Sequence, residues 1–278
     1  MSSSQARTSQ DEERYSLREV KTTSEYFAKR TIETHAQFFV PYLRAGMRLL
    51  DCGCGPGTIS VGLAKAIAPG QLVGIDLDEH HIELARQHAA DIGVSNVHFE
   101  TANVYHIPYD DQSFDAVFCH AVLEHLEKPD TALAEIYRVL KPQGLFGIRT
   151  PDHDGNLLWP EHQGFIAAMD FLKKMIASHG GDGSRGKQFR ARLVNAGFVD
   201  IQMSASYESF GTPEGVRAWA EMCAGAVEDP KFIERVVSRG LVDGETLAEY
   251  ATACREWAQH PGAFHARTWC EAIGWISA

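Results

Sequence analysis

The sequence predicts an α/β fold with a doubly wound, mostly parallel β-sheet. Short apolar segments alternate with helix-forming segments between residues 47 and 150, and this alternation is typical of right-handed βαβ units. The apolar segments are nearly continuous, as expected for strands that helices cover on both faces. With 44% hydrophobic and 23% charged residues, the chain also has the composition of a globular protein.

Strands are expected where short apolar runs are bounded by turn residues. In chain order these runs are MRLLDC, QLVGID, NVHFE, FDAVFC, LFGIRT, VDIQMSASY and RTWCEAIGWISA. Helices are expected where apolar residues recur at helical spacing and the run ends near glycine or proline. In chain order these segments are TISVGLAKAI, EHHIELARQHAADIG, PDTALAEIYRVLKP, FIAAMDFLKKMIASHG and GKQFRARLVNAGF.

An N-terminal region precedes this alternation. Residues 1–22 are polar and are expected to form a flexible arm. Residues 23–46 contain apolar residues at roughly helical spacing, with Ser24 in an N-cap position and Pro41 near the end. We therefore expect a helical cap over residues 23–46, with its helix at 24–40.

The rest of the chain is expected to form one core with two additions. Residues 47–211 form the core, and within it the irregular segment 151–185 follows a strand whose carboxyl end should border the ligand crevice, so we expect it to act as a lid. Residues 212–262 have helical patterns only, whereas residues 263–278 return to strand character. This order predicts a helical insertion before the last strand of the sheet. Its apolar residues are expected to wall a pocket, and they include Trp219, Met222 and Phe232.

The charge and cysteine content exclude several classes of protein. The net charge is −11, which makes a nucleic-acid or anionic-membrane partner unexpected. No segment approaches the ~18 apolar residues of a membrane span, and the polar N-terminus lacks the apolar stretch of a secretory signal. The six cysteines form no CxxC pair and are expected to be buried thiols in a reducing compartment. A cytoplasmic location is therefore expected.

A glycine-rich turn follows the first expected strand in LLDCGCGPGTIS. Gly53, Gly55 and Gly57 lack side chains, which lets the chain turn tightly and lets a ligand approach the backbone. The turn opens a helix, whose N-terminus favours polar or anionic ligand groups. A dinucleotide fingerprint would have its third glycine at position 58, which is Thr58. A nicotinamide-dependent oxidoreductase is therefore disfavoured.

Two further polar residues follow neighbouring strands. Asp76 ends the second strand in LVGIDLD, and a carboxylate there can accept hydrogen bonds from both hydroxyls of a ribose. Asn103 follows the third strand. The segments LLDCGCGPGTIS, VGIDLD, IPYDDQSFDAVFCHAVLEHL and EIYRVLKPQG together resemble, in order and spacing, the motifs of class I S-adenosylmethionine-dependent methyltransferases. They are most similar to the ubiquinone/menaquinone-biosynthesis-type branch, which acts on small molecules.

The resemblance covers about residues 30–205 and implies a Rossmann-like, seven-stranded sheet with one antiparallel strand at its edge. It also implies that residues 47–211 bind S-adenosyl-L-methionine. Asp51, Gly53 and Gly55 would hold the methionine moiety. Asp76 would bind the ribose, and Leu77 would lie against the adenine.

The remaining cofactor contacts that the resemblance implies are Asn103, Val104 and His120. Asn103 departs from the aspartate that is usual in the family, where the carboxylate accepts a hydrogen bond from the adenine amino group. An amide oxygen accepts the same bond without charge assistance. We therefore expect this contact to be kept.

Most candidate substrate and catalytic residues lie in or after the fourth and fifth strands, and Tyr26 lies in the N-terminal cap. Tyr26, Arg149 and Trp159 are the expected substrate contacts. His125 and His153 are the candidate general bases, because an unperturbed imidazole titrates near neutral pH. His125 has a positioning or packing role as its alternative. The run DHDG around His153 contains metal-ligand types in a loop without regular ligand geometry, so we expect it to form a polar pocket wall and expect no metal.

The expected activity is methyl transfer to a small-molecule acceptor by in-line displacement. This reaction needs a nucleophile ~3–3.5 Å from the methyl carbon and protected from water. It needs a base only where the acceptor proton has a high pKa. Methylation of oxygen, nitrogen or carbon remains open at this point. The alternative is a methyltransferase-like, cofactor-binding protein with a non-methylating activity, such as cyclisation, or a regulatory role.

Overall fold

The computed structural model describes residue 26 and residues 29–278. Its centre is a mixed β-sheet in which five parallel strands take the order β3-β2-β1-β4-β5. These strands are β1 (Arg48–Cys52), β2 (Gln71–Asp76), β3 (Val97–Thr101), β4 (Phe114–His120) and β5 (Leu140–Pro151). β1 pairs with both β2 and β4, so the direction of winding reverses beside β1. In open α/β sheets, ligands bind at the carboxyl ends of the strands at such a reversal.

Two long strands complete the sheet. β8 (Phe264–Trp275) runs antiparallel to β5, and β7 (Val199–Phe210) pairs with the other edge of β8. The predicted fold class and the antiparallel last strand are confirmed. The antiparallel strand lies one position inside the edge, however, because β7 forms the edge itself.

An eighth, short strand lies in the segment that the sequence predicts to be irregular. β6 (Leu157–Trp159) pairs antiparallel with the first residues of β8. β5 pairs with β8 only from Trp269 onward. The first half of β8 therefore keeps a free edge for β6, and the backbone groups of this segment are paired there.

Helices cover both faces of the sheet, as a doubly wound fold requires. α2 (Ile32–His35) and α3 (Thr58–Ala66) pack their apolar side chains on one face. α4 (Glu79–Asp91) packs beside α3. α5 (Pro129–Val139) and α7 (Phe189–Asn195) cover the opposite face.

The expected N-terminal helix is interrupted in the residues that the structure describes. Thr31 is non-helical and caps the four-residue helix α2, and a 3-10 turn, η1 (Val40–Tyr42), follows. The capping box of Thr31 with Thr34 starts a new helix at this point. A single helix over 24–40 is therefore wrong in its described part. The predicted arm at 1–22 and the expected N-cap Ser24 lie outside the described residues.

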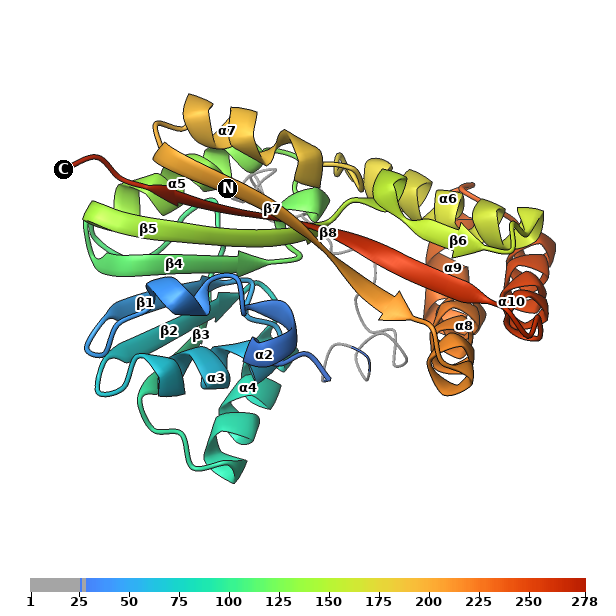
Figure 1. Ribbon diagram of the computed structural model, residues 1–278, viewed down its shortest axis with the longest axis horizontal. Coiled ribbons are helices and arrows are strands. Elements are labelled where there is room, and N and C mark those ends of the chain that lie inside the picture. Colours follow the sequence, from blue (N-terminus) through green and yellow to red (C-terminus); the bar gives the residue numbers. More distant parts are fainter. Residues whose placement is uncertain (1–25, 27–28) are drawn as a thin grey trace, which may run out of the picture.

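The helical insertion between β7 and β8 is present. It consists of α8 (Pro213–Glu228), α9 (Pro230–Ser238) and α10 (Gly244–Ala258). Figure 1 shows these helices gathered with α6 (Gln163–Ala177) at the end of the β7–β8 ribbon that projects away from β1–β4. These four helices bury their own apolar clusters, so they form a packed body beside the sheet.

All six cysteines are buried and unpaired, as expected. A search of the described residues for a membrane-spanning helix finds none of sufficient length and apolarity. The remaining short elements are 3-10 turns at η2 (Leu123–His125), η3 (His153–Gly155) and η4 (Gly186–Gln188).

Candidate active site

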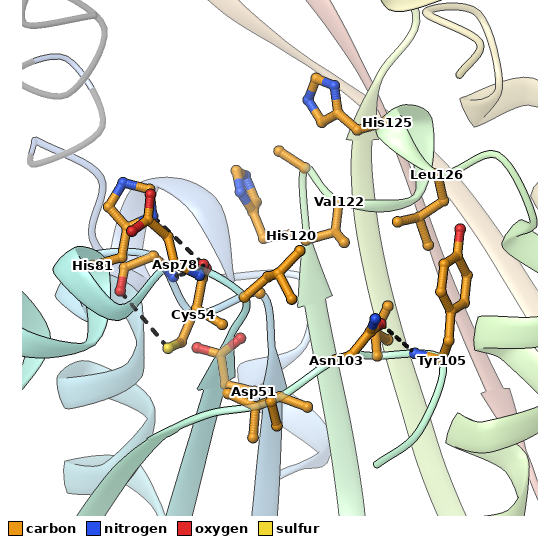
Figure 2. A pocket seen from close by; sticks show the side chains of 18 of the residues that line it. Asp51, Cys54, Asp78, His81, Asn103, Tyr105, His120, Val122, His125 and Leu126 are labelled. Atoms are coloured by element: carbon orange, nitrogen blue, oxygen red, sulfur yellow. Dashed lines mark hydrogen bonds and ion pairs between the residues drawn. The ribbon is translucent and has the colours of Figure 1, made fainter. Parts of the chain in front are cut away.

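A cavity of about 540 Å³ lies where the winding of the sheet reverses. Its volume is in the range of small-ligand sites, and we call it the cofactor cavity. Figure 2 shows the side chains of Asp51, Asn103 and His120 around it, each at the end of a different strand. The structure places every predicted cofactor contact in its lining, namely Asp51, Gly53, Gly55, Asp76, Leu77, Asn103, Val104 and His120.

The glycine turn forms one wall of this cavity. Gly53 and Gly55 have φ angles of +72° and +53°, in the left-handed region that favours glycine. A β-carbon on Gly53 would lie 2.2 Å from Cγ2 of Val122, whereas one on Gly55 would meet no atom within 4 Å. Packing therefore requires glycine at position 53. At position 55 the backbone conformation requires it, and open space lies beside it.

The carboxylate of Asp76 joins the turn to the end of β2. Its Oδ2 accepts a hydrogen bond from the backbone amide of Gly55 at 2.9 Å, and its Oδ1 accepts one from the amide of Asp78 at 2.9 Å. His81 Nδ1 lies 3.5 Å from Asp76 Oδ1. A carboxylate has about four lone-pair positions, so Asp76 keeps capacity for ligand hydroxyls while it holds the turn.

Asp51 is a buried carboxyl in the same wall. Its side chain accepts a 2.6 Å hydrogen bond from Ser60 Oγ. Burial raises the pKa of Asp51 to about 7, with smaller contributions from the Ser60 hydrogen bond, which lowers it, and from the charge of Asp76, which raises it. A ligand cation beside Asp51 would stabilise the ionised carboxylate. The ammonium of an amino-acid moiety meets this requirement.

Leu77 and Asn103 also line the cofactor cavity. Leu77 is 52% exposed, which leaves an apolar surface for a flat ring. Oδ1 of Asn103 accepts a 2.9 Å hydrogen bond from the amide of Tyr105. The amide oxygen has a second lone pair, so Asn103 can hold its own loop and still accept a hydrogen bond from a ligand amino group.

His120 is a buried residue of the cofactor cavity lining, and Arg149 contacts its ring. Its Nε2 lies 3.3 Å from Arg149 Nη1, and because a guanidinium only donates, Nε2 accepts and the ring proton sits on Nδ1. Burial, aided by Arg30 and Arg149, lowers the pKa of His120 well below its usual value. Arg149 Nε donates to Glu271 Oε1 at 3.1 Å.

Arg149 therefore has a different position from the one predicted. Its guanidinium is buried, and it lines neither this cavity nor the second one described below. Burial lowers its pKa to about 10, and the carboxylate of Glu271 opposes this shift. Arg149 supports His120 instead of projecting toward a substrate.

A second cavity, of about 100 Å³, adjoins the first. We call it the acceptor cavity. Its wall is mainly apolar and includes the three residues expected from the helical insertion, Trp219, Met222 and Phe232. Of the residues that the structure describes, Arg30, Ala121 and His125 line both cavities. Ala121 has a φ of +55°, an unusual conformation for alanine that is characteristic of functional positions.

The two candidate bases have different surroundings. His125 lies where the cavities meet, with Nε2 3.6 Å from Glu124 Oε1. Burial lowers the pKa of His125, and Glu124 opposes this shift. His153 lines only the acceptor cavity, and burial with a contribution from Arg267 lowers its pKa to about 3. Both imidazoles are therefore neutral near pH 7.

Of the other predicted substrate contacts, the structure places one in the acceptor cavity. Tyr26 lines it, and its hydroxyl donates to Glu208 Oε1. Burial raises the pKa of Tyr26. Trp159 lines neither cavity and is 62% exposed, because β6 carries it to the beginning of β8.

The run DHDG forms ionic contacts. Asp154 accepts from Lys187 Nζ at 2.5 Å and from Lys173 Nζ at 3.3 Å. Asp152 caps the turn η3. In the described part of the chain, no group of three or more histidine, cysteine or acidic side chains is arranged to hold a metal ion.

Sequence reasoning missed Arg30, Glu124 and Arg267 as lining residues of the acceptor cavity. Arg267 precedes Trp269 in the last strand, and nothing in the local pattern marks it. Its position depends on how β8 pairs with β7 and β6. Glu124 directly precedes the predicted residue His125 in the VLEHL segment, and this adjacency could have indicated that Glu124 also lines the cavity.

Comparisons with known proteins identify the family of this chain. Residues 43–182 match the family model described as a methyltransferase domain. An uncharacterized methyltransferase of Schizosaccharomyces pombe is 31% identical over 77% of this chain and 76% of its own length. The demethylmenaquinone methyltransferase of Lactiplantibacillus plantarum is 35% identical over 50% of this chain and 60% of its own.

Among solved structures, a putative methyltransferase from Bacillus halodurans has a TM-score of 0.59. It is 17% identical and covers 87% of this chain and 98% of that one, so this likeness concerns the fold. The family match covers half of the chain, and the yeast relative covers three quarters. The chain therefore belongs to the methyltransferase-domain family and is an S-adenosylmethionine-dependent methyltransferase.

Proposed function

We propose that this enzyme methylates a nucleophilic atom of a small molecule bound in the acceptor cavity. One observation carries the proposal: Arg30, Ala121 and His125 line both cavities. Displacement at a methyl group requires the nucleophile within ~3–3.5 Å of the methyl carbon and in line with the bond that breaks. Two cavities that meet at shared side chains provide a place for this encounter.

The lining of the cofactor cavity fits S-adenosylmethionine. Open space beside Gly55 leaves room for a ligand against the backbone, and the buried carboxyl of Asp51 lacks a cationic partner among its described hydrogen-bond contacts. We assign Asp51 to the ammonium group, Asp76 to the ribose hydroxyls, and Leu77 with Asn103 to the adenine. The bound cofactor supplies a methyl group that is already activated on a sulfonium.

His125 is the residue we assign to the acceptor proton. It lies where the two cavities meet, and burial keeps its imidazole neutral near pH 7, so it can accept a proton. Glu124 Oε1 lies 3.6 Å from its Nε2 and stabilises the imidazolium that forms. With S-adenosylmethionine bound, its sulfonium would supply the methyl group to the acceptor atom, and the proton that the acceptor loses would pass to His125.

Helices outside the sheet wall the acceptor cavity. The acceptor cavity is walled by residues of α6, α8 and α9 together with Tyr26. We propose that segment 151–185 and the insertion 212–262 form the lid that determines acceptor choice. The likeness to a demethylmenaquinone methyltransferase supports a small-molecule acceptor. We also propose that the enzyme is most similar to the ubiquinone/menaquinone-biosynthesis-type methyltransferases.

The test is incubation with methyl-labelled S-adenosylmethionine and a panel of phenols, amines and quinols. Transfer of label to an acceptor, with release of S-adenosylhomocysteine, is the expected result. The class of acceptor that gains label then identifies the methylated atom. Tight cofactor binding together with conversion of an acceptor to an unlabelled isomer would contradict the proposal and favour a cyclisation activity.

A further inference from the structure

Arg267 lies on the wall of the acceptor cavity. Its Cζ lies 4.6 Å from the ring centroid of Trp269. Its Nε is buried without a hydrogen-bond acceptor. No described residue forms a side-chain hydrogen bond or an ion pair with the Arg267 guanidinium, whereas the neighbouring Arg149 and Trp269 have such partners.

The carboxylate beside Arg267 is already engaged by other donors. Glu208 lies directly across from Arg267 in the β7–β8 pairing. Its Oε1 accepts the hydroxyl of Tyr26, and its Oε2 accepts Trp269 Nε1 at 3.2 Å. Glu208 therefore contributes negative charge nearby without forming an ion pair with Arg267.

Arg149 also packs against Trp269, and unlike Arg267 it has a carboxylate partner. The Cζ of Arg149 lies 4.2 Å from the centroid of Trp269, and its Nε bonds Glu271 at 3.1 Å. Glu271 is held in turn by the hydroxyls of Ser204 and Ser206. The chain thus supplies a carboxylate partner for Arg149, whereas none of the described carboxylates pairs with Arg267 on the cavity wall.

Among the described residues of this lining, Arg30 and Arg267 are positively charged and Glu124 is negatively charged. Arg30 is 8% exposed and lines both cavities. His125 and His153 are neutral near pH 7, because burial lowers the pKa of each. Glu124 is the acidic residue of this lining, and it accepts the hydroxyl of Thr150. Leaving a partly buried guanidinium without a counter-ion is costly, and a ligand anion would offset that cost.

We propose that the acceptor is a small apolar acid whose carboxylate binds Arg267 and whose apolar body lies among α6, α8 and α9. This inference rests on the proposed function, because it takes this cavity as the acceptor site. The apolar wall for the body includes Met169, Phe171, Met175, Trp219, Met222 and Phe232. The cavity of about 100 Å³ is of the same order as the ~150 Å³ cavity that holds a benzene ring, so the body is about the size of one ring.

Binding to the full chain saturated with S-adenosylhomocysteine tests this inference. The probes are benzoate, salicylate and cinnamate, each compared with its uncharged amide by calorimetry. In the wild type we expect at least one acid to bind about tenfold to a hundredfold more tightly than its amide. Arg267→Gln should abolish this preference and leave the affinity for the amide nearly unchanged. Arg267→Lys should retain part of it, since the charge remains without the planar fork.

The matched control is Arg217→Gln, which removes an exposed guanidinium of α8 that pairs with Glu214. This variant should keep the full preference for the acid. Amides that bind as well as acids, acids that fail to bind at all, or a preference that survives Arg267→Gln would each overturn the inference.

These binding measurements involve no methyl transfer, so the two proposals fail separately. Acid-selective binding that depends on Arg267, without label transfer to any acceptor, would support the anion site and contradict the proposed function. Label transfer to neutral acceptors that is unaffected by Arg267→Gln would support the methylation and contradict the anion site.

Discussion

Gly55 and Asp76 are joined by a hydrogen bond of 2.9 Å from the backbone amide to Oδ2, across the carboxyl ends of β1 and β2. The other carboxylate oxygen holds the amide of Asp78 at 2.9 Å. One side chain thus orients two backbone segments of the cofactor cavity before any ligand arrives. Such preorganisation reduces the ordering cost of binding.

Replacing Asp76 should therefore cost both cofactor affinity and stability of the turn. Asp76→Ala removes the acceptor of two backbone amides and of the ribose hydroxyls that we assign to it. We expect the affinity for S-adenosylhomocysteine to fall by about tenfold to a hundredfold or more, and the melting temperature of the free protein to fall as well. Calorimetry and thermal unfolding measure the two effects. Asp91→Ala, on the exposed side of α4, is the control, and wild-type affinity in Asp76→Ala would refute the assignment.

The two glycines of the turn should respond differently to alanine. In Gly53→Ala the new methyl would lie 2.2 Å from Val122 Cγ2, so we expect a clear loss of stability that Val122→Ala partly restores. In Gly55→Ala the methyl meets no protein atom within 4 Å. Its cost in stability should be the ~1–2 kcal/mol of a left-handed alanine, with a larger loss in cofactor affinity. Thermal unfolding with and without S-adenosylhomocysteine distinguishes the two variants, and equal ligand stabilisation in Gly55→Ala and wild type would contradict this picture.

The cofactor side of the site could be predicted because its residues lie close together in the sequence. Asp51, Gly53 and Gly55 fall in one turn, and the βαβ rhythm places Asp76 at the end of the adjacent parallel strand. The carboxyl ends of such strands meet at one edge of the sheet. Local pattern and topology were therefore sufficient for these contacts.

The acceptor side depends on pairings between distant segments. Arg149 meets Glu271 because β5 pairs with β8 in one register, and a shift of one strand by one residue would place the two side chains on opposite faces of the sheet. The same dependence hides Arg267. Trp159 was misplaced because a three-residue strand such as β6 is too short for an alternating pattern, and its partner lies about one hundred residues later. Local capping at Thr31 likewise prevailed over the helical spacing of the N-terminal segment.

The carboxyl of Asp51 should give the free protein a pH-dependent stability. Its folded pKa of about 7 lies above the unfolded value of about 3.9, so between these values the folded state keeps a proton that the unfolded state has lost. The unfolding free energy should therefore fall as pH rises from about 4 to about 7, and then level. Asp51→Asn should remove this part of the slope. Denaturant unfolding across this range measures it, and identical slopes in both proteins would disprove the contribution.

The ionisation of Asp51 should also make cofactor affinity depend on pH, in the opposite direction to the stability of the free protein. A ligand ammonium beside Asp51 favours the ionised carboxylate, so the affinity for S-adenosylhomocysteine should rise between about pH 5 and pH 7 in the wild type. It should change much less in Asp51→Asn. Ser60→Ala removes the 2.6 Å hydrogen bond that favours ionisation and should move the rise to higher pH. Calorimetric titrations at several pH values provide the test, and a flat wild-type profile would place the ammonium away from Asp51.

His125 should control the rate of methyl transfer more strongly than cofactor binding. With the best acceptor of the labelled panel, we expect His125→Gln to lower kcat about a hundredfold or more, because glutamine cannot take the acceptor proton. Burial puts the pKa of His125 below its usual value, so wild-type kcat should be level near neutral pH and fall on acidification, when the imidazole becomes protonated and can no longer act as a base. His98→Gln, at an exposed position of β3 that lines neither cavity, is the matched control and should leave kcat unchanged. His125→Gln with wild-type kcat and an unaltered pH profile would show that this imidazole does not receive the acceptor proton.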